Sequence, residues 1–324
     1  MRAVVYRGAG GTEVIGLENR PDPTPGREQV VVRVRAAGLN RADLIQRRGN
    51  YPAPPGWPAD IPGLEYAGVV EALGEGVAGW HPGDRVMGLV GGGAHAEYVV
   101  VHHRELLAVP EHLSDGEAAS LPEAFLTAYD ALAIRGRLRP GERVLIHAVG
   151  SGVSTAAVQL AKWLGATVIG TSRTAAKLER ARALGLDEGI DTGREGFAAQ
   201  LKTPVDVILD YFGGPALSDN LGLLALRGRL VLLGTLQGAQ ASSVNVGVIL
   251  RSRLEVIGSV MRTRPHDERA ALVGEFANRV MPELRPGGRL RPVVGVEFEM
   301  AEIAAAHEAM ESNRVFGKIV LLWS

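Results

Sequence analysis

The segment HAVGSGVSTAA, residues 147–157, has glycines and hydroxyl side chains between an apolar run and an Ala-rich helical pattern. Free backbone N–H groups and the positive end of a helix dipole let such a strand-to-helix turn bind phosphate groups. A regular G-x-G-x-x-G motif would need glycine at Val149, Ser151 and Ser154. The chain instead has Gly150 and Gly152, which we expect to supply the freedom of the turn. On its own, this motif fits a pyrophosphate-binding turn and a purely structural turn equally well.

The elements around this turn favour the nucleotide-binding interpretation. From Glu142 onward, short apolar runs alternate with helical patterns. The expected strands are VLIHAV, TVIGTS, EGID, VDVILDYF, RLVLLGTL and LEVIGSVM, with an Ala-rich helix ending at Gly165 and further helices at 175–184, 194–201, 216–226 and 245–252. Continuous Val, Ile and Leu runs are typical of parallel strands that are buried on both faces. The pattern therefore predicts a doubly wound α/β fold, in which ligands bind at the carboxyl ends of the strands.

Short strands in the first third of the chain predict a second, β-rich domain. Apolar runs at 3–6, 30–36, 67–73, 84–90 and 96–102 are separated by Gly and Pro clusters, which suggests a partly closed barrel. Ser114 and Glu117 form a capping-box pattern that predicts a helix through about Ala133. Beyond Met261 we expect a helix, a strand at 292–300, a helix at 301–311 and a closing strand at 318–323.

The composition excludes several classes of function. At 324 residues and 34.3 kDa the chain exceeds one usual domain, so two domains are expected. It is 46% hydrophobic and 22% charged with a formal net charge of −1, which gives no electrostatic sign of nucleic-acid or anionic-membrane binding. No apolar run reaches the roughly eighteen residues of a spanning helix, and the N-terminus lacks a signal-peptide pattern. These features predict a cytoplasmic protein.

The metal-ligating residue types argue against a metal site. The chain has no cysteine, which excludes disulfides, thiolate zinc sites and a cysteine nucleophile. Its eight histidines show no H-E-x-x-H spacing. His102 and His103 are adjacent on an expected strand, where neighbouring side chains point to opposite faces. Histidine and carboxylate ligands could still bind a metal, but the spacing favours packed or solvated histidines over metal ligands, and we therefore predict no bound metal.

The end of the second expected strand of the parallel sheet bears on the choice of dinucleotide. NAD sites usually carry Asp or Glu about twenty residues after the fingerprint, where it binds the ribose hydroxyls. Here Gly170 is expected at that position, followed by Ser172, Arg173 and Lys177. Solvent exposure at a helix start would also explain either basic residue alone. Together with the missing acid, however, Arg173 and Lys177 favour the extra phosphate of NADPH.

Several blocks of the sequence resemble one enzyme family. They are AAGLNRADLIQRRGNYP, PGLEYAGVVEALGEGVAGWHPGDRVMGL, GGGAHAEYVVV, LPEAFLTAYDAL and HAVGSGVSTAAVQLAKWLGA. The chain resembles the medium-chain dehydrogenase/reductase superfamily, and within it the zinc-free quinone oxidoreductases related to zeta-crystallin, close to the p53-inducible branch. The resemblance implies a GroES-like catalytic domain at 1–122 and 266–324 and a Rossmann NADPH-binding domain at 123–265. It also implies a homodimer or, in some cases, a tetramer.

The same resemblance implies a reaction without a metal ion. Zinc-containing relatives have a cysteine ligand where this chain has Asn40 and a histidine ligand where it has Leu64. Leucine cannot coordinate zinc, so the hydride acceptor must already be electron-poor. A quinone meets this requirement, because its reduction forms an aromatic hydroquinone.

By resemblance, the expected catalytic residues are Asn40, Asp43, Tyr51 and Ser151. Asn40 would donate an N–H group to a developing oxyanion, and Tyr51 would contact the cofactor or deliver a proton. The residues expected to bind NADPH are Thr127, Gly150, Ser151, Gly152, Val153, Gly170, Ser172, Arg173, Lys177, Thr192, Phe212, Gly234, Thr235, Leu236, Ser259, Val260, Met261 and Lys318.

Structural roles remain open for three of the catalytic candidates. Asn40 would cap the helix that follows it, and Asp43 would pair with Arg47 at helical spacing. Tyr51 would pack beside the PAPPGWP loop.

The sequence as a whole predicts an NADPH-dependent, zinc-independent quinone oxidoreductase. The nearest alternative is an NADPH-dependent reductase of enal or enoyl-thioester double bonds. An alternative of a different class is a noncatalytic NADPH-binding or structural protein.

Overall fold

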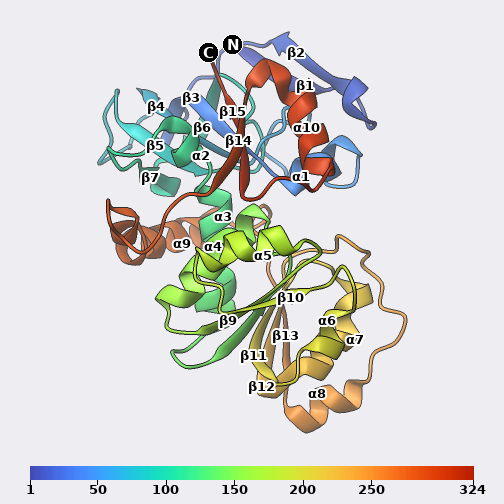
Figure 1. Cartoon of the computed structure of the whole chain (residues 1–324). Coiled ribbons are helices and arrows are strands. Elements are labelled where there is room, and N and C mark those ends of the chain that lie inside the picture. Colours follow the sequence, from blue (N-terminus) through green and yellow to red (C-terminus); the bar gives the residue numbers. More distant parts are fainter. The chain divides into compact units, whose positions relative to one another are not determined.

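The computed structural model describes residues 1–324, and the chain divides into two compact units (Figure 1). Unit 1 contains Met1–Leu126 and Met261–Ser324, and unit 2 contains Thr127–Val260. None of the helices is both long and apolar enough to span a membrane.

Unit 2 is built on a six-stranded parallel sheet with the strand order β10-β9-β8-β11-β12-β13. Its strands are β8 (Arg143–Ile146), β9 (Thr167–Ser172), β10 (Glu188–Asp191), β11 (Val205–Asp210), β12 (Leu224–Leu232) and β13 (Glu255–Gly258). The order reverses between β8 and β11, which is the point where doubly wound sheets bind their ligands. The predicted α/β fold is confirmed.

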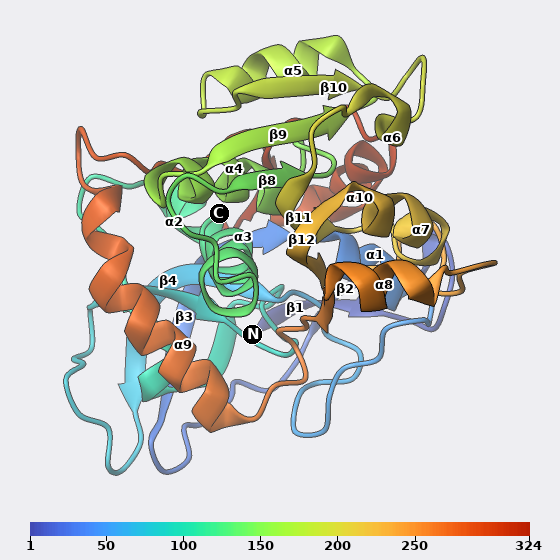
Figure 2. The same cartoon turned by 90° about the horizontal axis from the view of Figure 1, so that it is seen from below.

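Helices cover both faces of this sheet. On one side α4 (Gly152–Trp163) contacts β8 and β9, and α5 (Ala175–Arg182) contacts β9 and β10. The other helices are α6 (Phe197–Gln200), α7 (Gly214–Leu223) and α8 (Val246–Ser252). They contact one another, and Figure 2 shows α7 and α8 on the side opposite α4. Both faces are therefore apolar, as the uninterrupted Val, Ile and Leu runs predict.

Unit 1 is a β-rich domain that the C-terminal segment completes. Its main sheet has the order β14-β15-β3-β4-β5-β7, and β6 also pairs with β3. The strands are β3 (Gln29–Leu39), β4 (Glu65–Leu73), β5 (Arg85–Leu89), β6 (Tyr98–His102), β7 (Leu106–Ala108), β14 (Val294–Glu299) and β15 (Lys318–Leu322). A separate hairpin is formed by β1 (Arg2–Tyr6) and β2 (Ile15–Asn19). Strand β15 pairs with β3, and Arg2 donates a hydrogen bond to the Ser324 carbonyl at 3.1 Å, so the two chain ends lie side by side (Figure 1).

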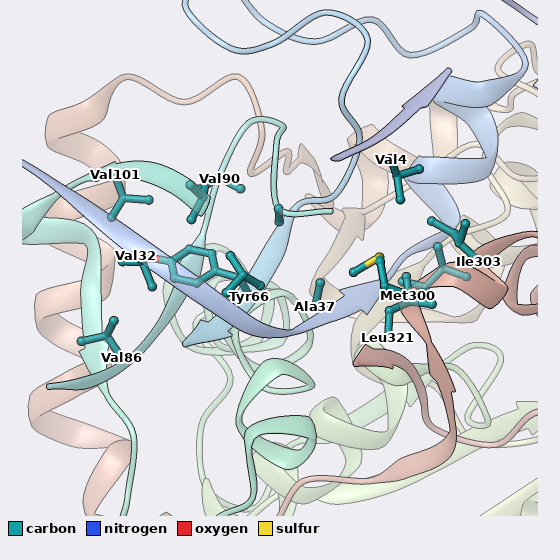
Figure 3. Close-up of a cluster of buried hydrophobic side chains, with 14 of the residues drawn as sticks. Val4, Val32, Ala37, Tyr66, Val86, Val90, Val101, Met300, Ile303 and Leu321 are labelled. Atoms are coloured by element: carbon teal, nitrogen blue, oxygen red, sulfur yellow. The ribbon is translucent and has the colours of Figure 1, made fainter. Parts of the chain in front are cut away.

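The core of unit 1 gathers around β3. Apolar side chains from the N-terminal strands and from the C-terminal segment meet in one cluster (Figure 3), which includes Val4, Val32, Ala37, Tyr66, Val86, Val90, Val101, Met300, Ile303 and Leu321. Helices α1 (Arg41–Arg47), α9 (His266–Arg279) and α10 (Ile303–Glu311) complete this unit. The C-terminal segment from Val296 onward thus contributes to this core.

The expectation of one continuous helix from residue 114 to about Ala133 is wrong, because the segment is divided into three helical pieces. Its capping box is present, because Glu117 N–H donates to Ser114 Oγ at 3.1 Å and Ser114 N–H donates to the Glu117 carboxylate at 3.0 Å. However, α2 (Asp115–Ala119) ends before α3 (Pro122–Tyr129), and a π-helical segment follows at Asp130–Arg135. Proline lacks the N–H group that would continue the first helix, so the chain restarts at Pro122.

The expectation that His102 and His103 point apart is also wrong. Strand β6 ends at His102, and His103 begins a 3₁₀ helix, His103–Glu105. The change of backbone direction removes the alternation of a strand. The two imidazole rings are stacked, with 4.9 Å between their centroids.

Candidate functional site

The turn between β8 and α4 is closed by two serines. Ser151 is the N-cap of α4, and its Oγ accepts a hydrogen bond from Ser154 N–H at 3.2 Å. The Ser154 hydroxyl is buried and donates to the carbonyl oxygen of His147 at 2.9 Å. A serine at the third fingerprint position is therefore compatible with close packing, because its hydroxyl is satisfied inside the turn.

The strained residue of this turn is Ala148. Its φ is 51°, in the left-handed region that favours glycine, whereas neither Gly150 nor Gly152 has a positive φ. Ala148 N–H donates to Thr171 Oγ1 at 3.2 Å, and its carbonyl accepts from Ser151 N–H at 2.9 Å. The expectation that the two glycines supply the freedom of the turn is therefore wrong.

Gly150 has a different role, because the side chain of Lys177 lies against it. A Cβ atom at Gly150 would be only 2.6 Å from Lys177 Cδ. The lysine comes from α5, which follows β9, and it runs directly over the strand-to-helix turn. The nearby Arg173 is exposed to solvent. The missing side chain at Gly150 thus makes room for a basic residue at the turn between β8 and α4.

Gly170 is a packing residue within β9. A Cβ atom there would lie 2.2 Å from Val149 Cγ1 and 2.7 Å from Leu186 Cδ1. The strand ends two residues later at Ser172, whose Oγ accepts from Thr174 N–H at 3.1 Å. The carboxyl end of the strand, where an acidic residue would bind a ribose, is therefore Ser172 and not Gly170.

The buried His147 side chain stabilises the start of this turn through contacts with neighbouring elements. Its ring nitrogens contact Thr171 Oγ1 at 3.1 Å and Asn220 Oδ1 at 2.8 Å, and the Phe212 ring lies 4.8 Å away between centroids. Burial lowers the pKa of His147 to about 4. The ring is therefore neutral at pH 7 and joins β8, β9 and α7 without carrying charge.

Most of the remaining positions expected to bind the cofactor lie along one edge of the parallel sheet. The first turn of α4 contains Gly152 and Val153, and the segments that follow strands β10 to β13 contain Thr192, Phe212, Gly234, Thr235, Leu236, Ser259 and Val260. The Ser259 hydroxyl already donates to Asp130 Oδ2 at 2.7 Å. Thr127 is buried in α3, and Met261 is buried in unit 1.

In unit 1, the side chain of Asn40 is part of a buried network. Its Nδ2 donates to Glu65 Oε1 at 3.0 Å and to the Gly38 carbonyl at 3.3 Å. Its Oδ1 accepts from Lys318 Nζ at 2.6 Å, and the ammonium group also contacts the Glu65 carboxylate and the Leu39 carbonyl. Both N–H bonds of the amide are therefore engaged in this arrangement, and Lys318 is bound to the catalytic candidate.

The Asp43 side chain fixes the backbone at the start of α1 by accepting hydrogen bonds from two backbone N–H groups. Its carboxylate accepts from Asn40 N–H at 2.8 Å and from Gly63 N–H at 3.2 Å, and it is fully buried. The expected ion pair between Asp43 and Arg47 is wrong, because Arg47 pairs with Glu311 at 2.6 Å. Asn40 is the N-cap residue of α1, as expected, and its backbone N–H group donates to the Asp43 carboxylate, as in a capping box.

Tyr51 is held in place by Arg262. The Arg262 guanidinium carbon lies 4.7 Å from the centroid of the Tyr51 ring, and Arg262 Nη1 donates to the Tyr51 carbonyl at 2.9 Å. The same guanidinium group donates to Gln46 Oε1 at 2.7 Å and to the Gly91 carbonyl at 2.7 Å. Burial raises the pKa of Tyr51, so its hydroxyl is protonated at neutral pH. No motif marks Arg262 in SVMRTRP, and only its place after an apolar run is unusual.

Two family models match the chain. One describes an alcohol dehydrogenase GroES-like domain and matches residues 26–111, which lie in unit 1. The other describes a zinc-binding dehydrogenase and matches residues 152–279, most of which lie in unit 2. The matches follow the two units of the fold.

Relatives are similar along the whole chain. The quinone oxidoreductase of Pseudomonas aeruginosa is 34% identical and covers 99% of this chain and 99% of its own length. The synaptic vesicle membrane protein VAT-1 homolog of Rattus norvegicus is 33% identical over 99% of this chain and 84% of its own length.

Two solved structures extend the comparison. The quinone oxidoreductase of Thermus thermophilus, also described in complex with NADPH, is 37% identical with a TM-score of 0.83 and covers 99% of this chain and 100% of its own. The CurK enoyl reductase is 27% identical with a TM-score of 0.87 and covers 100% of this chain and 99% of its own. The chain therefore belongs to the medium-chain dehydrogenase/reductase superfamily of nicotinamide-dependent oxidoreductases, among the quinone oxidoreductases related to zeta-crystallin.

Proposed function

We propose that this protein is an NADPH-dependent, zinc-independent reductase of quinones. The observation that carries the proposal is the side chain of Lys177, which lies against Gly150 at the phosphate-binding turn. Strand β9 ends there without a carboxylate, at Ser172. A positive charge next to this turn fits a nucleotide with an additional phosphate on its adenosine ribose.

Zinc independence is proposed from the chemistry of the side chains. Leu64 is buried and has no atom that binds a metal. Asn40, at the position of a cysteine ligand in zinc-containing relatives, has its amide oxygen bound to Lys318 and its amide nitrogen bound to Glu65. These two positions therefore do not fit a catalytic zinc ion, although the matching family model is named for zinc-binding dehydrogenases.

NADPH, when bound, supplies a hydride ion, and the protein must orient the acceptor and provide a proton. Tyr51 is our candidate for the proton donor, because burial keeps its hydroxyl protonated. Arg262 fixes the Tyr51 loop through the carbonyl contact and through the aromatic ring. Its guanidinium group also places a positive charge near this tyrosine, which favours negative charge on a substrate oxygen. We assign Asn40 and Asp43 to shaping the site, because their polar groups have partners within unit 1.

A second candidate function is the reduction of activated carbon–carbon double bonds. The similarity to CurK enoyl reductase favours it, since the whole of both chains aligns. A noncatalytic role in NADPH binding is the third possibility, and only turnover measurements separate it from the other two.

One assay distinguishes these functions. The protein with NADPH is mixed with 1,2-naphthoquinone, an enal or an enoyl thioester, and NADPH oxidation is followed by absorbance. We expect the highest kcat/KM with the quinone. A higher kcat/KM with the enal or thioester would establish the second function, and tight NADPH binding without turnover of any acceptor would establish the third.

We also propose that the protein is a homodimer. Strand β13 is an edge of the parallel sheet, so one row of its backbone polar groups has no strand to pair with. Large apolar side chains are exposed on β12, β13 and α8, namely Leu226, Val256, Val246 and Leu250. An exposed apolar surface of this kind is typical of a subunit interface.

A further inference from the structure

A cluster of potential metal ligands lies in unit 1, outside the residues assigned to the reaction. The ligand atoms of Glu28, His102 and His103 all lie within 4.8 Å of one another. His102 Nε2 and Glu28 Oε2 are 3.9 Å apart. None of these three residues takes part in the buried networks of Asn40 or Tyr51.

The backbone holds the three residues together. In the antiparallel pairing of β3 and β6, Gln29 lies opposite His102, and His103 N–H donates to the Glu28 carbonyl at 3.0 Å. The 3₁₀ helix that begins at His103 turns its ring onto the same side as that of His102. Glu28 itself has a φ of 59°, an uncommon conformation for glutamate. Strained residues of this kind are concentrated at functional sites.

A further histidine and its carboxylate partner pack against this cluster. The ring centroid of His266, at the start of α9, lies 3.8 Å from that of His102. His266 Nδ1 contacts Glu105 Oε1 at 2.5 Å, while its Nε2 is buried and has no hydrogen-bond partner. The Glu105 carboxylate thereby fixes the orientation of the His266 ring that packs against His102.

We propose that Glu28, His102 and His103 form a binding site for a divalent transition metal, with Zn²⁺ as the best match. Two imidazoles and one carboxylate are a ligand set that zinc sites use together with a water molecule. Ligand atoms around a tetrahedral zinc are about 3.3 Å apart, given bond lengths of about 2.0–2.1 Å. Zinc binding therefore requires side-chain rotation of the exposed Glu28 and of His103, which would shorten the present spacing.

Metal binding at His102 costs one hydrogen bond, the one between the Arg104 backbone N–H group and His102 Nδ1. Its Nδ1 accepts from the backbone N–H of Arg104 at 3.2 Å, so the proton of the neutral ring lies on Nε2. A metal ion at Nε2 displaces this proton, and the ring must then be protonated on Nδ1. The backbone N–H group of Arg104 then loses its hydrogen-bond acceptor. A change in the environment of this amide is therefore a second, local sign of metal binding.

The direct test is the zinc content of the full-length protein. The chain is stripped with EDTA, dialysed against Zn²⁺ and measured by elemental analysis, with Mg²⁺ in parallel as a hard cation that imidazoles bind poorly. We expect about one zinc per chain and no Mg²⁺ retention. His103→Gln and Glu28→Gln should each weaken zinc binding at least tenfold. At a zinc concentration that fills only the unsubstituted site, the NMR signal of the Arg104 amide should shift in the unsubstituted chain and not in these two variants.

His81→Gln is the matched control, because His81 and Asp84 are an exposed histidine–carboxylate pair at 3.7 Å without a second histidine. This variant should bind zinc as the unsubstituted chain does. Absence of stoichiometric zinc, or equal binding by the His103→Gln and Glu28→Gln variants, would overturn the proposal. Because metal content is measured without turnover, the result is independent of the proposed quinone reductase activity.

Discussion

At the scale of single residues, two glycines leave the space that neighbouring charged side chains occupy. Gly150 has no Cβ atom, and the stem of Lys177 occupies that space. Gly38 plays the same part in unit 1, since a Cβ atom there would overlap the Glu65 carboxylate that binds Asn40 and Lys318. In both places the chemistry of a site depends on a neighbouring glycine.

The first prediction concerns the choice of cofactor. Lys177→Ala should raise the Kd for NADPH at least tenfold and change the Kd for NADH by less than twofold, because the lost contact is with the extra phosphate. Fluorescence titration with both nucleotides measures the two constants. Lys202→Ala is the control, since Lys202 is exposed and contacts only the nearby Ala199 carbonyl. Equal weakening for both nucleotides would contradict the role of Lys177.

The second prediction concerns Tyr51. Tyr51→Phe keeps the ring beneath Arg262 but removes the hydroxyl, so kcat with a quinone should fall by about 10²-fold while the thermal unfolding temperature is unchanged. Burial raises the pKa of this tyrosine, and its protonated form persists above pH 10. Activity should therefore show no loss from Tyr51 ionisation between pH 6 and 9. An unchanged kcat in the variant would show that the hydroxyl takes no part in the reaction.

Sequence patterns identify the residues of the candidate site better than they identify the hydrogen-bond partners of those residues. Asn40, Asp43 and Tyr51 are recognisable from one block of sequence, but hydrogen bonds to Lys318, Gly63 and other distant positions depend on the tertiary fold. Arg262 is the clearest omission, because it reaches Tyr51 across 211 positions of the chain. Local motifs carry no information on such contacts.

At the scale of elements, the turn between β8 and α4 is made of hydrogen bonds and of one strained residue. The alternation of apolar runs predicts the six strands, since strands buried on both faces leave a clear pattern in the sequence. The left-handed conformation of Ala148 leaves no such pattern. The break at Pro122 and the stacked His102 and His103 rings are missed for a related reason, because each depends on where an element ends.

The third prediction follows from that strain. Ala148→Gly should stabilise the protein by about 1 kcal/mol, because glycine adopts a positive φ without the steric cost that alanine meets. Urea unfolding of the two proteins measures the difference. Ala271→Gly, at an exposed position in the interior of α9, should have the opposite sign and destabilise by about 1 kcal/mol. Destabilisation by Ala148→Gly would show that the turn relaxes around alanine.

At the scale of the whole molecule, the chain combines a parallel-sheet unit with a β-rich unit that its two ends build together. The parallel-sheet unit contains the turn between β8 and α4, at which we propose that the nucleotide binds, and the other unit contains Tyr51 and Arg262. The apolar surface on β12, β13 and α8 belongs to the parallel-sheet unit. The proposed homodimer would use that surface.

The fourth prediction tests this interface. Val256→Asp together with Leu250→Glu should convert a dimer into a monomer at micromolar concentration, because charges would be buried against apolar side chains. Light scattering after size-exclusion chromatography gives the mass. Leu17→Glu, an exposed apolar position in unit 1, should leave the dimer intact. A monomeric unsubstituted protein would refute the homodimer.

The central claim is that NADPH reduces a quinone on this protein without a metal ion at the reaction centre. The measurement is the rate of NADPH and of NADH oxidation with 1,2-naphthoquinone, before and after EDTA treatment, with zinc content determined on the same samples. We predict a rate that is unchanged by EDTA and a kcat/KM at least tenfold higher with NADPH. Equal use of the two nucleotides, or activity that EDTA abolishes and zinc restores, would contradict the claim.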